Sequence, residues 1–176
     1  SIHPSGTHQA LFCVFKDISS AEKFYASSKL IQWYKEHAKD FFSVKLKAYS
    51  LKGQWSGFVP QITAQAPQSG PIVSITRASI KPLYCLPFWR KQPAAEVSLE
   101  QSSGCIIAAG VGEAPFFRQA TFSIWDNVSD MNAYARTGSH LAAIQAAQKN
   151  GYFSESMFAR FVPLKVQGQW MGKHYA

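Results

Sequence analysis

The stretch Ala10-Leu-Phe-Cys-Val-Phe-Lys-Asp-Ile-Ser19 resembles a second stretch, Ala120-Thr-Phe-Ser-Ile-Trp-Asp-Asn-Val-Ser129, at an offset of 110. Most apolar side chains of one stretch fall on apolar side chains of the other. A second pair follows in the same order, because Gly53-Gln-Trp-Ser-Gly57 matches Gly168-Gln-Trp-Met-Gly172. Two matches in one order indicate an internal duplication.

Each copy has the pattern strand, helix, strand. The first strands are predicted at 10–16 and 119–125, two aromatic and β-branched runs, and Ser19 and Ser129 after them can cap helices. Apolar periodicity predicts helices over 20–38 and 130–150, with Gly151 ending the second helix. Strands over 41–51 and 156–167 complete the two copies.

Three further elements precede the second copy: a strand at 71–80, a helix within 83–101 and a strand at 104–111 that turns at Gly112-Glu113-Ala114-Pro115. The resulting β-α-β-β-α-β order is ferredoxin-like. The predicted fold class is α+β, a single domain over 1–176 in which two ferredoxin-like halves form a fold of the dimeric α+β barrel type.

The first predicted half, residues 1–59, is incomplete at its N-terminus, because residues 1–9 are too few to supply another strand and helix. Residues 60–70, rich in Pro, Gln and Ser, form the predicted linker to the complete second half at 71–176. Three interpretations stay open: a fragment, a shortened chain, or a protein that completes its barrel as a homodimer.

Composition excludes some classes of protein. With 47% apolar residues among 176, the chain can bury a core. Its formal charge of +8 favours anionic partners, but the Lys and Arg residues are scattered and no nucleic-acid module accompanies them, so we expect peripheral membrane association and no nucleic-acid binding. No apolar run of membrane-spanning length and no signal peptide is present, which predicts a cytoplasmic protein.

Catalytic motifs of hydrolases and kinases, and dinucleotide fingerprints, are absent. Among the five histidines, His140 is the candidate ligand, because it precedes a small apolar helix face formed by Ala143, Ile144 and Ala147. From spacing alone, a surface histidine near a helix start is the favoured interpretation. The cysteines, Cys13, Cys85 and Cys105, fit neither a disulfide framework nor a metal knuckle.

The segments PIVSITRASIKP, GVGEAPFFRQATFSIWDNVSDMNAYAR, SHLAAI and YFSESMFARFVPLKVQGQW, with Phe88-Trp89-Arg90 between the first two, resemble the bacterial spheroidene monooxygenase family of carotenoid biosynthesis. The likeness covers about residues 50–172.

The resemblance implies an oxidoreductase containing haem b that uses dioxygen and an external electron donor such as ferredoxin. Such an enzyme oxidises an activated methylene of a linear carotenoid, by hydroxylation and then to the ketone. On this chain the family's histidine falls on His140, the expected iron ligand. Arg77 and Arg118 are expected at the haem propionates, and the expected substrate contacts are Trp89, Phe117 and Trp125.

Two other functions share the same fold prediction. One is a non-catalytic protein that binds haem or another lipophile. The other is a cofactor-free monooxygenase, in which the activated substrate reduces dioxygen directly. Thiolate ligation through Cys85 or Cys105 is a lesser alternative, since neither lies in a recognisable thiolate loop.

Overall fold

The computed structural model describes residues 8–90, 97–99, 101–114 and 116–176, apart from the side chains at 139, 140, 143 and 148. Two compact units divide the chain. The first comprises the residues up to 10 together with 47–162, and the second comprises 11–46 and 163–176. The long strands β1 (Phe42–Gly53) and β5 (Phe153–Trp170) contribute residues to both units.

The sheet of the first unit has the ferredoxin-like strand order. Strand β5 pairs with β2 (Ile72–Ile80), β2 with β4 (Arg118–Trp125), and β4 with β3 (Cys105–Ala114), all antiparallel, and β1 lies beside β5. The predicted α+β fold is confirmed, as are the predicted strands at 41–51, 71–80, 104–111, 119–125 and 156–167. One turn comes later than predicted, because β3 continues through Gly112 and Glu113 to Ala114.

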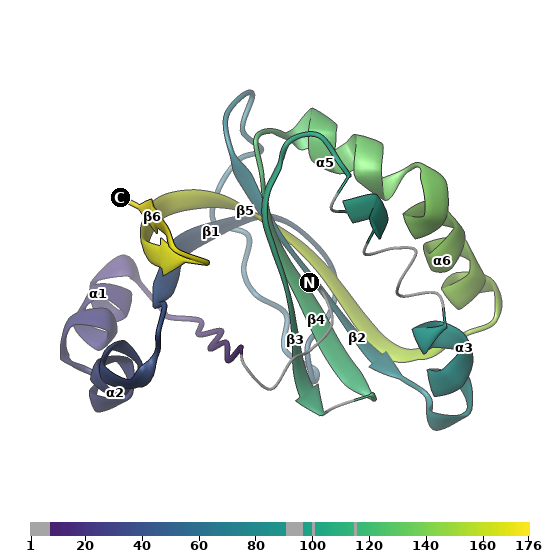
Figure 1. Ribbon diagram of the computed structural model, residues 1–176, viewed down its shortest axis with the longest axis horizontal. Coiled ribbons are helices and arrows are strands. Elements are labelled where there is room, and N and C mark those ends of the chain that lie inside the picture. Colours follow the sequence, from purple (N-terminus) through teal and green to yellow (C-terminus); the bar gives the residue numbers. More distant parts are fainter. Residues whose placement is uncertain (1–7, 91–96, 100, 115) are drawn as a thin grey trace. The chain divides into compact units, whose positions relative to one another are not determined.

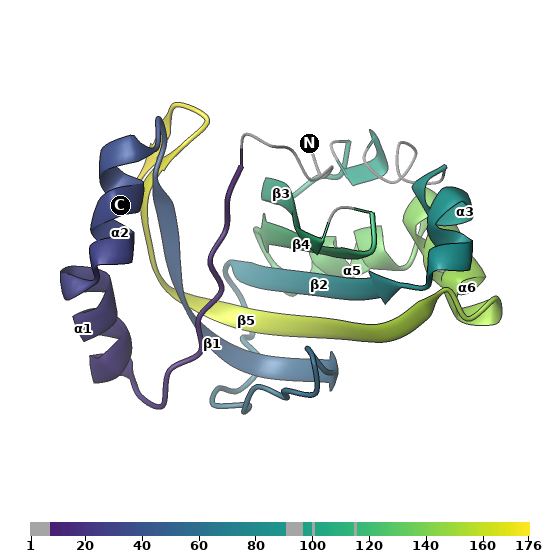
Figure 2. The same cartoon turned by 90° about the horizontal axis from the view of Figure 1, so that it is seen from below.

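Helices cover one face of this sheet (Figures 1 and 2). They are α3 (Cys85–Trp89), which follows the 3-10 turn η1 (Pro82–Tyr84), α5 (Val128–Ala135) and α6 (Gly138–Lys149). Ile72 and Trp125 lie directly opposite each other on β2 and β4 and pack in one cluster with Met131 of α5. Because side chains alternate along a strand, Arg77 lies on the face away from the helices.

The helices are shorter and begin earlier than the sequence predicts. The predicted helix 20–38 is two helices, α1 (Ile18–Ser27) and α2 (Lys29–His37), separated by the extended backbone of Ser28, whose hydroxyl accepts from Leu30 N (3.2 Å). Likewise, the predicted helix 130–150 is divided into α5 and α6 at residues 136–137. The predicted helix within 83–101 is present as α3 and as helical residues 97–99, while 91–96 and 100 lie outside the description.

The predicted caps at Ser19 and Ser129 are wrong, because the chain turns into each helix two residues earlier. Asp17 Oδ1 accepts from Ser20 N at 2.7 Å, and Asn127 Oδ1 accepts from Asp130 N at 2.9 Å. Both caps have extended backbone, as N-caps require. The two caps are 110 positions apart, like the repeated stretches, so the duplication extends to helix capping.

The predicted strand at 10–16 is also wrong. Residues 8–15 have no regular secondary structure, and Leu11 and Val14 are 46% and 52% exposed. The counterpart of this segment is β4, which pairs with both β2 and β3. The described part of the chain contains no first-copy equivalents of β2 and β3, so a strand-like sequence is left without backbone partners.

The repeated glycine-rich segments form equivalent turns. Ser56 and Gly57 have φ of 49° and 78°, and Met171 and Gly172 have the same two values. Each turn begins where a strand ends, β1 or β5, and the second turn leads into β6 (Lys173–Tyr175), which pairs with β5.

At the start of each turn a glycine lies against a backbone carbonyl. A Cβ at Gly53 would overlap the Ser156 oxygen, and one at Gly168 would overlap the Phe41 oxygen. The same two carbonyls accept hydrogen bonds from the next backbone N–H groups, those of Gln54 (3.1 Å) and Gln169 (2.7 Å). The two matched glycine-rich segments thus have the same backbone geometry and the same kind of carbonyl contact.

No helix of the described residues has the length and apolar character needed to cross a bilayer.

Candidate functional site

A carboxylate holds the turn after β1. Glu155 of β5 accepts from the backbone N–H groups of Ser56 (2.8 Å) and Gly57 (3.2 Å) and from the side-chain amide of Gln54 (3.3 Å). These hydrogen bonds, with the charge of Arg77, hold the pKa of Glu155 below its ordinary value. Glu155 is thus ionised at neutral pH, and it fixes the turn against the sheet.

Arg77 lies beside this carboxylate with 1% of its side chain exposed. Its Nε and Nη2 donate to the two carboxylate oxygens of Glu113 at 3.2 and 3.0 Å, and its Nη1 donates to Glu155. Trp55 lies 4.9 Å from the guanidinium, measured to the ring centre. Burial alone would lower the pKa of Arg77, but hydrogen bonds and charges from the two glutamates raise it above its ordinary value.

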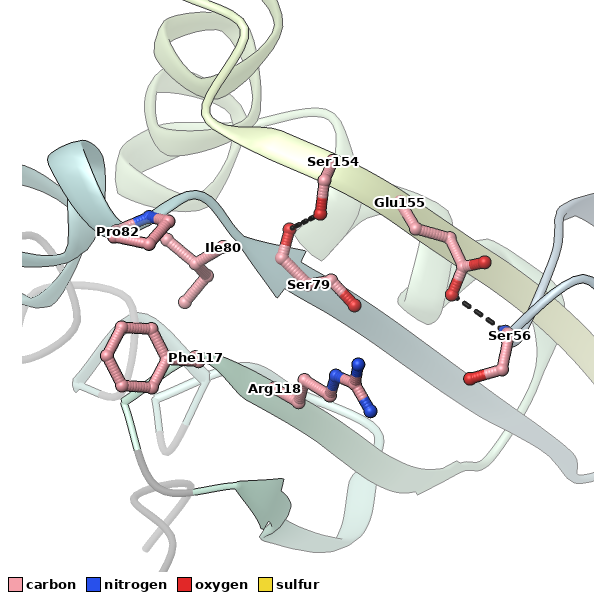
Figure 3. Close-up of a pocket in the computed structure, with 8 residues that line it drawn as sticks. All are labelled: Ser56, Ser79, Ile80, Pro82, Phe117, Arg118, Ser154 and Glu155. Atoms are coloured by element: carbon pink, nitrogen blue, oxygen red, sulfur yellow. Dashed lines mark hydrogen bonds between the residues drawn. The ribbon is translucent and has the colours of Figure 1, made fainter.

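A pocket of about 450 Å³ opens beside this cluster (Figure 3). A cross-strand row supplies its floor, because Ser79 of β2 lies directly opposite both Arg118 of β4 and Glu155 of β5. The complete lining is Ser56, Ser79, Ile80, Pro82, Phe117, Arg118, Ser154 and Glu155. Ligand pockets commonly measure roughly 300–1,000 Å³, so this one suits a small ligand or one end of a long ligand.

Two of the residues predicted from the sequence line this pocket, and two lie close to it. Phe117 and Arg118 are in the wall, 45% and 55% exposed. Arg77 lies one row further along the same face. Trp89 of α3 donates from Nε1 to the carbonyl of Phe116 (3.1 Å), the neighbour of Phe117. The substrate and propionate contacts predicted for these residues stay predictions.

Trp125 lies elsewhere, in the helix-covered core. It is 1% exposed, its Nε1 donates to Ser123 Oγ (2.9 Å), and its ring lies 5.3 Å from that of Tyr134. The sequence places it among the substrate contacts, but in this structure it packs beneath α5 as a core residue.

His140 is in the first turn of α6, and its side chain and that of Ala143 lie outside the description. Of the predicted apolar face, Ala147 is 3% exposed and Ile144 is partly buried. That face turns toward the protein interior, on the helix-covered side of the sheet.

The structure does not bring His140 together with Arg77 and Arg118. The helix that carries His140 covers one face of the sheet (Figure 1), whereas both arginines project from the other face. Among the described strand residues, Arg160 is a cation on the helix-covered face, where it pairs in register with Ser74 and donates from Nη2 to Asn132 of α5 (3.1 Å).

Sequence reasoning missed most of the pocket, including Ser56, Ser79, Ser154 and Glu155. The repeated glycine-rich turn was a usable signal for Ser56, since a tight turn conserved between two copies needs a partner to hold it. Nothing in the sequence marks Glu155 as that partner, because the contact joins residues that lie far apart along the chain.

The comparison with solved structures concerns the fold of the chain. No family model matches the chain. A solved structure titled as a putative monooxygenase from Fusobacterium nucleatum is 11% identical, covers 92% of this chain and 71% of its own, and superposes with a TM-score of 0.54. This likeness supports the α+β fold with ferredoxin-like units.

Two curated relatives then define the family. The spheroidene monooxygenase of Rubrivivax gelatinosus is 47% identical over 99% of this chain and 67% of its own length. That of Rhodobacter capsulatus is 35% identical over 93% of this chain and 70% of its own. The chain belongs to the spheroidene monooxygenase family. It spans about two thirds of these two relatives and 52% of a third, from Cereibacter sphaeroides.

Proposed function

We propose that this chain carries a haem-dependent monooxygenase activity that oxidises a linear carotenoid at an activated methylene. The observation that carries the proposal is the 47% identity over nearly the whole chain to a spheroidene monooxygenase. The largely apolar interior and the pocket at the sheet end are compatible with a long apolar substrate, whose binding would come mainly from buried apolar area.

The haem would be held on the helix-covered side of the sheet, with His140 as the iron ligand. Two features of the described residues support this side. Ala147 and Ile144 supply a low apolar wall on α6, and Arg160 has a buried Nε without a hydrogen-bond partner among the described residues. A buried cationic N–H without a partner is costly, and a propionate oxygen would satisfy it.

Arg77 and Arg118 have no direct part in this version of the haem site. Both lie on the opposite face, and the guanidinium of Arg77 is already bonded to two carboxylates and to the Ser56 hydroxyl. We therefore replace them by Arg160 as the proposed propionate contact.

When bound, the haem would supply dioxygen activation, which no side chain can provide. In the proposed reaction one oxygen atom enters a C–H bond of the methylene to give the alcohol. The other oxygen leaves as water with two electrons from an external donor and two protons. A second hydroxylation at the same carbon gives a hydrate, which loses water to form the ketone. The protein's part is to hold the chain of the substrate and to exclude water.

The proposed reaction also needs an electron donor and access to the substrate. A ferredoxin-like donor would supply the electrons. The charge of +8 would favour approach to an anionic membrane surface, where an apolar substrate accumulates.

The test is the absorption spectrum of the haem-supplemented chain beside His140→Ala, with His37→Ala as the matched control. His37 is an exposed histidine on α2 whose Nδ1 lies 2.8 Å from the Trp33 carbonyl. We expect a Soret band in the unaltered chain and in His37→Ala, and a lost or strongly shifted band in His140→Ala. No band in any of the three would remove haem from the proposal and favour the cofactor-free monooxygenase.

A further inference from the structure

The turn and short helix that follow β2 carry the most exposed large apolar side chains described in the first unit. Leu83 of η1 and Leu86 of α3 are 89% and 73% exposed, and Phe116, just before β4, is 64% exposed. Ser79 of β2 lies directly opposite Arg118 of β4, so all three side chains belong to one end of the sheet. We call Leu83, Leu86 and Phe116 the apolar tip.

Packing on the inner side of α3 fixes which of its side chains point outward. Tyr84 stacks on Tyr152, with 4.9 Å between the ring centres. The ring centre of Phe88 lies 5.8 Å from that of Phe153. Residues four apart share one face of a helix, so Tyr84 and Phe88 bury the same face. The two leucines of the apolar tip, three positions apart, are left on the outer face.

Phe116 is held beside α3 in a backbone conformation that bulky residues rarely adopt. Its φ is 72°. Its carbonyl accepts from Trp89 Nε1 (3.1 Å) and Cys85 Sγ (3.5 Å), and its ring centre lies 5.9 Å from that of Trp89. Such a backbone persists where its surroundings fix it, and it is common at ligand contacts. The structure therefore fixes an exposed phenyl ring next to the helix that carries the exposed leucines.

The same end of the sheet is basic. Lys81 N donates to the carbonyl of Tyr152 (2.9 Å), which joins the turn after α6 to η1. The segments that meet here, 80–90, 116–118 and 149–154, contain four basic residues and no acidic residue: Lys81, Arg90, Arg118 and Lys149. All four are exposed. Among the described residues only Arg118 has an ion pair, and it is long, at 3.9 Å from Glu113.

These features favour a lipid surface over a protein partner. A stable protein interface buries about 800 Å² on each partner and fits its anchor residues into matching pockets. Three protruding side chains do not supply such a surface. A bilayer has no fixed shape to match, accepts protruding apolar side chains at its interface, and attracts neighbouring Lys and Arg when its headgroups are anionic.

We propose that the apolar tip docks the protein on the surface of an anionic lipid bilayer. Leu83, Leu86 and Phe116 enter the interface, and Lys81 and Arg90 lie against the headgroup phosphates. The proposal rests on the proposed function only for its purpose, access to an apolar substrate in the membrane. It assigns that approach to a defined surface instead of to the overall charge.

The experiment measures binding of the full chain to lipid vesicles by flotation. One set of vesicles is phosphatidylcholine alone, and the other contains about one third phosphatidylglycerol. The apolar test variant is Leu83→Gln with Leu86→Gln. Its matched control is Ile62→Gln with Met171→Gln, at apolar positions that are 57% and 75% exposed elsewhere on the chain. Thermal unfolding confirms that each variant is folded.

We expect the unaltered chain to bind the anionic vesicles and to bind phosphatidylcholine much more weakly. The leucine variant should bind the anionic vesicles at least about tenfold more weakly, because two apolar side chains no longer enter the interface. The Ile62 and Met171 control should stay within about twofold of the unaltered chain. No binding to anionic vesicles, or an equal loss in the two variants, would overturn the proposal.

The charge of the tip is tested separately. Lys81→Gln with Arg90→Gln should weaken binding to the anionic vesicles by about twentyfold. Lys29→Gln with Lys52→Gln removes the same charge from exposed positions away from the tip, and it should have a much smaller effect. Equal effects would show that the overall charge, and not this surface, attracts the membrane.

Insertion has its own readout. Lipids with brominated acyl chains should quench tryptophan emission in the unaltered chain, and Trp89→Phe should remove most of that quenching, because Trp89 lies against Phe116. Binding without quenching would contradict insertion of the tip. Sedimentation tests a second copy as the occupant: a dimer that the leucine variant converts to a monomer would overturn the lipid proposal.

Neither haem nor dioxygen enters these measurements. Vesicle binding through the tip without a Soret band would leave the docking surface standing while the haem-dependent function fails. A Soret band without vesicle binding would do the reverse.

Discussion

Glu155 and Asp40 hold equivalent turns in the two copies of the duplicated unit. Each carboxylate accepts from a glutamine side-chain amide and from the backbone N–H of the turn's last glycine. The copies differ in the further donors to the carboxylate, since Ser56 N also donates to Glu155 (2.8 Å). Arg77 donates to Glu155, whereas Asp40 has no cationic partner among the described residues.

The first glycine of each turn should be far less tolerant of substitution than the last. A methyl group at Gly53 or Gly168 would overlap a backbone carbonyl, whereas one at Gly57 or Gly172 would meet open space. All four have positive φ. We expect Gly57→Ala and Gly172→Ala to cost about 1–2 kcal/mol from backbone strain alone, and Gly53→Ala and Gly168→Ala about 3 kcal/mol or more. Urea unfolding measures the difference, and equal costs would contradict the close approach.

Arg77 should contribute far more to stability than Arg118. Arg77→Met removes the buried cation shared by Glu113 and Glu155, which are themselves partly exposed, and we expect a loss of about 1–3 kcal/mol in the free energy of unfolding. Arg118→Met removes a cation that is 55% exposed, so its cost should stay within about 0.5 kcal/mol. Chemical denaturation of both variants tests this, and a similar cost for the two would show that the Arg77 network adds little.

The sequence predicted those parts of the fold that depend on local pattern. The strands at 71–80 and 119–125 were predicted because their apolar runs have strand length. Element boundaries were less accurate: extended backbone at Asp17 and Asn127 starts the helices early, and Ser28 divides the first one. The strand predicted at 10–16 failed because a strand depends on its neighbours, which single-sequence patterns do not reveal.

The candidate site was less accessible to sequence reasoning. Phe117 and Arg118 were predicted as site residues and do line the pocket. Glu155, which lines the same pocket, was missed, because strand register brings it opposite Ser79 from a distant part of the chain. The expectation that Arg77 and His140 share a site came from the family resemblance. In the structure Arg77 lies on the face of the sheet away from the helices, whereas His140 is on α6, which covers the other face.

Acid should weaken the turn held by Glu155. Hydrogen bonds and Arg77 lower the pKa of Glu155 from its ordinary 4.5 in the folded chain, so the stabilisation is present above that value and is lost as the pH falls through the folded pKa. Glu155→Gln should therefore be less stable than the unaltered chain at pH 7 and approach it toward pH 3. Glu36→Gln, at an exposed position on α2, is the control. Thermal unfolding measured from pH 7 to pH 3 would contradict this if the two variants followed the same curve.

Cys105 should be unreactive in the folded protein. Burial, with a smaller effect from the charge of Asp126, raises the pKa of its thiol to about 11, so almost no thiolate is present at pH 8. Cys13 is exposed, and although burial raises its pKa somewhat, reagent can reach it. Alkylation at pH 8, followed by peptide mass spectrometry, should label Cys13 well before Cys105, with Cys105→Ser to identify the peptide. Fast labelling of Cys105 would reveal a thiolate in the folded chain and revive thiolate ligation of the haem. Slow labelling would remove Cys105 from the candidate ligands and leave His140 and Cys85 to test.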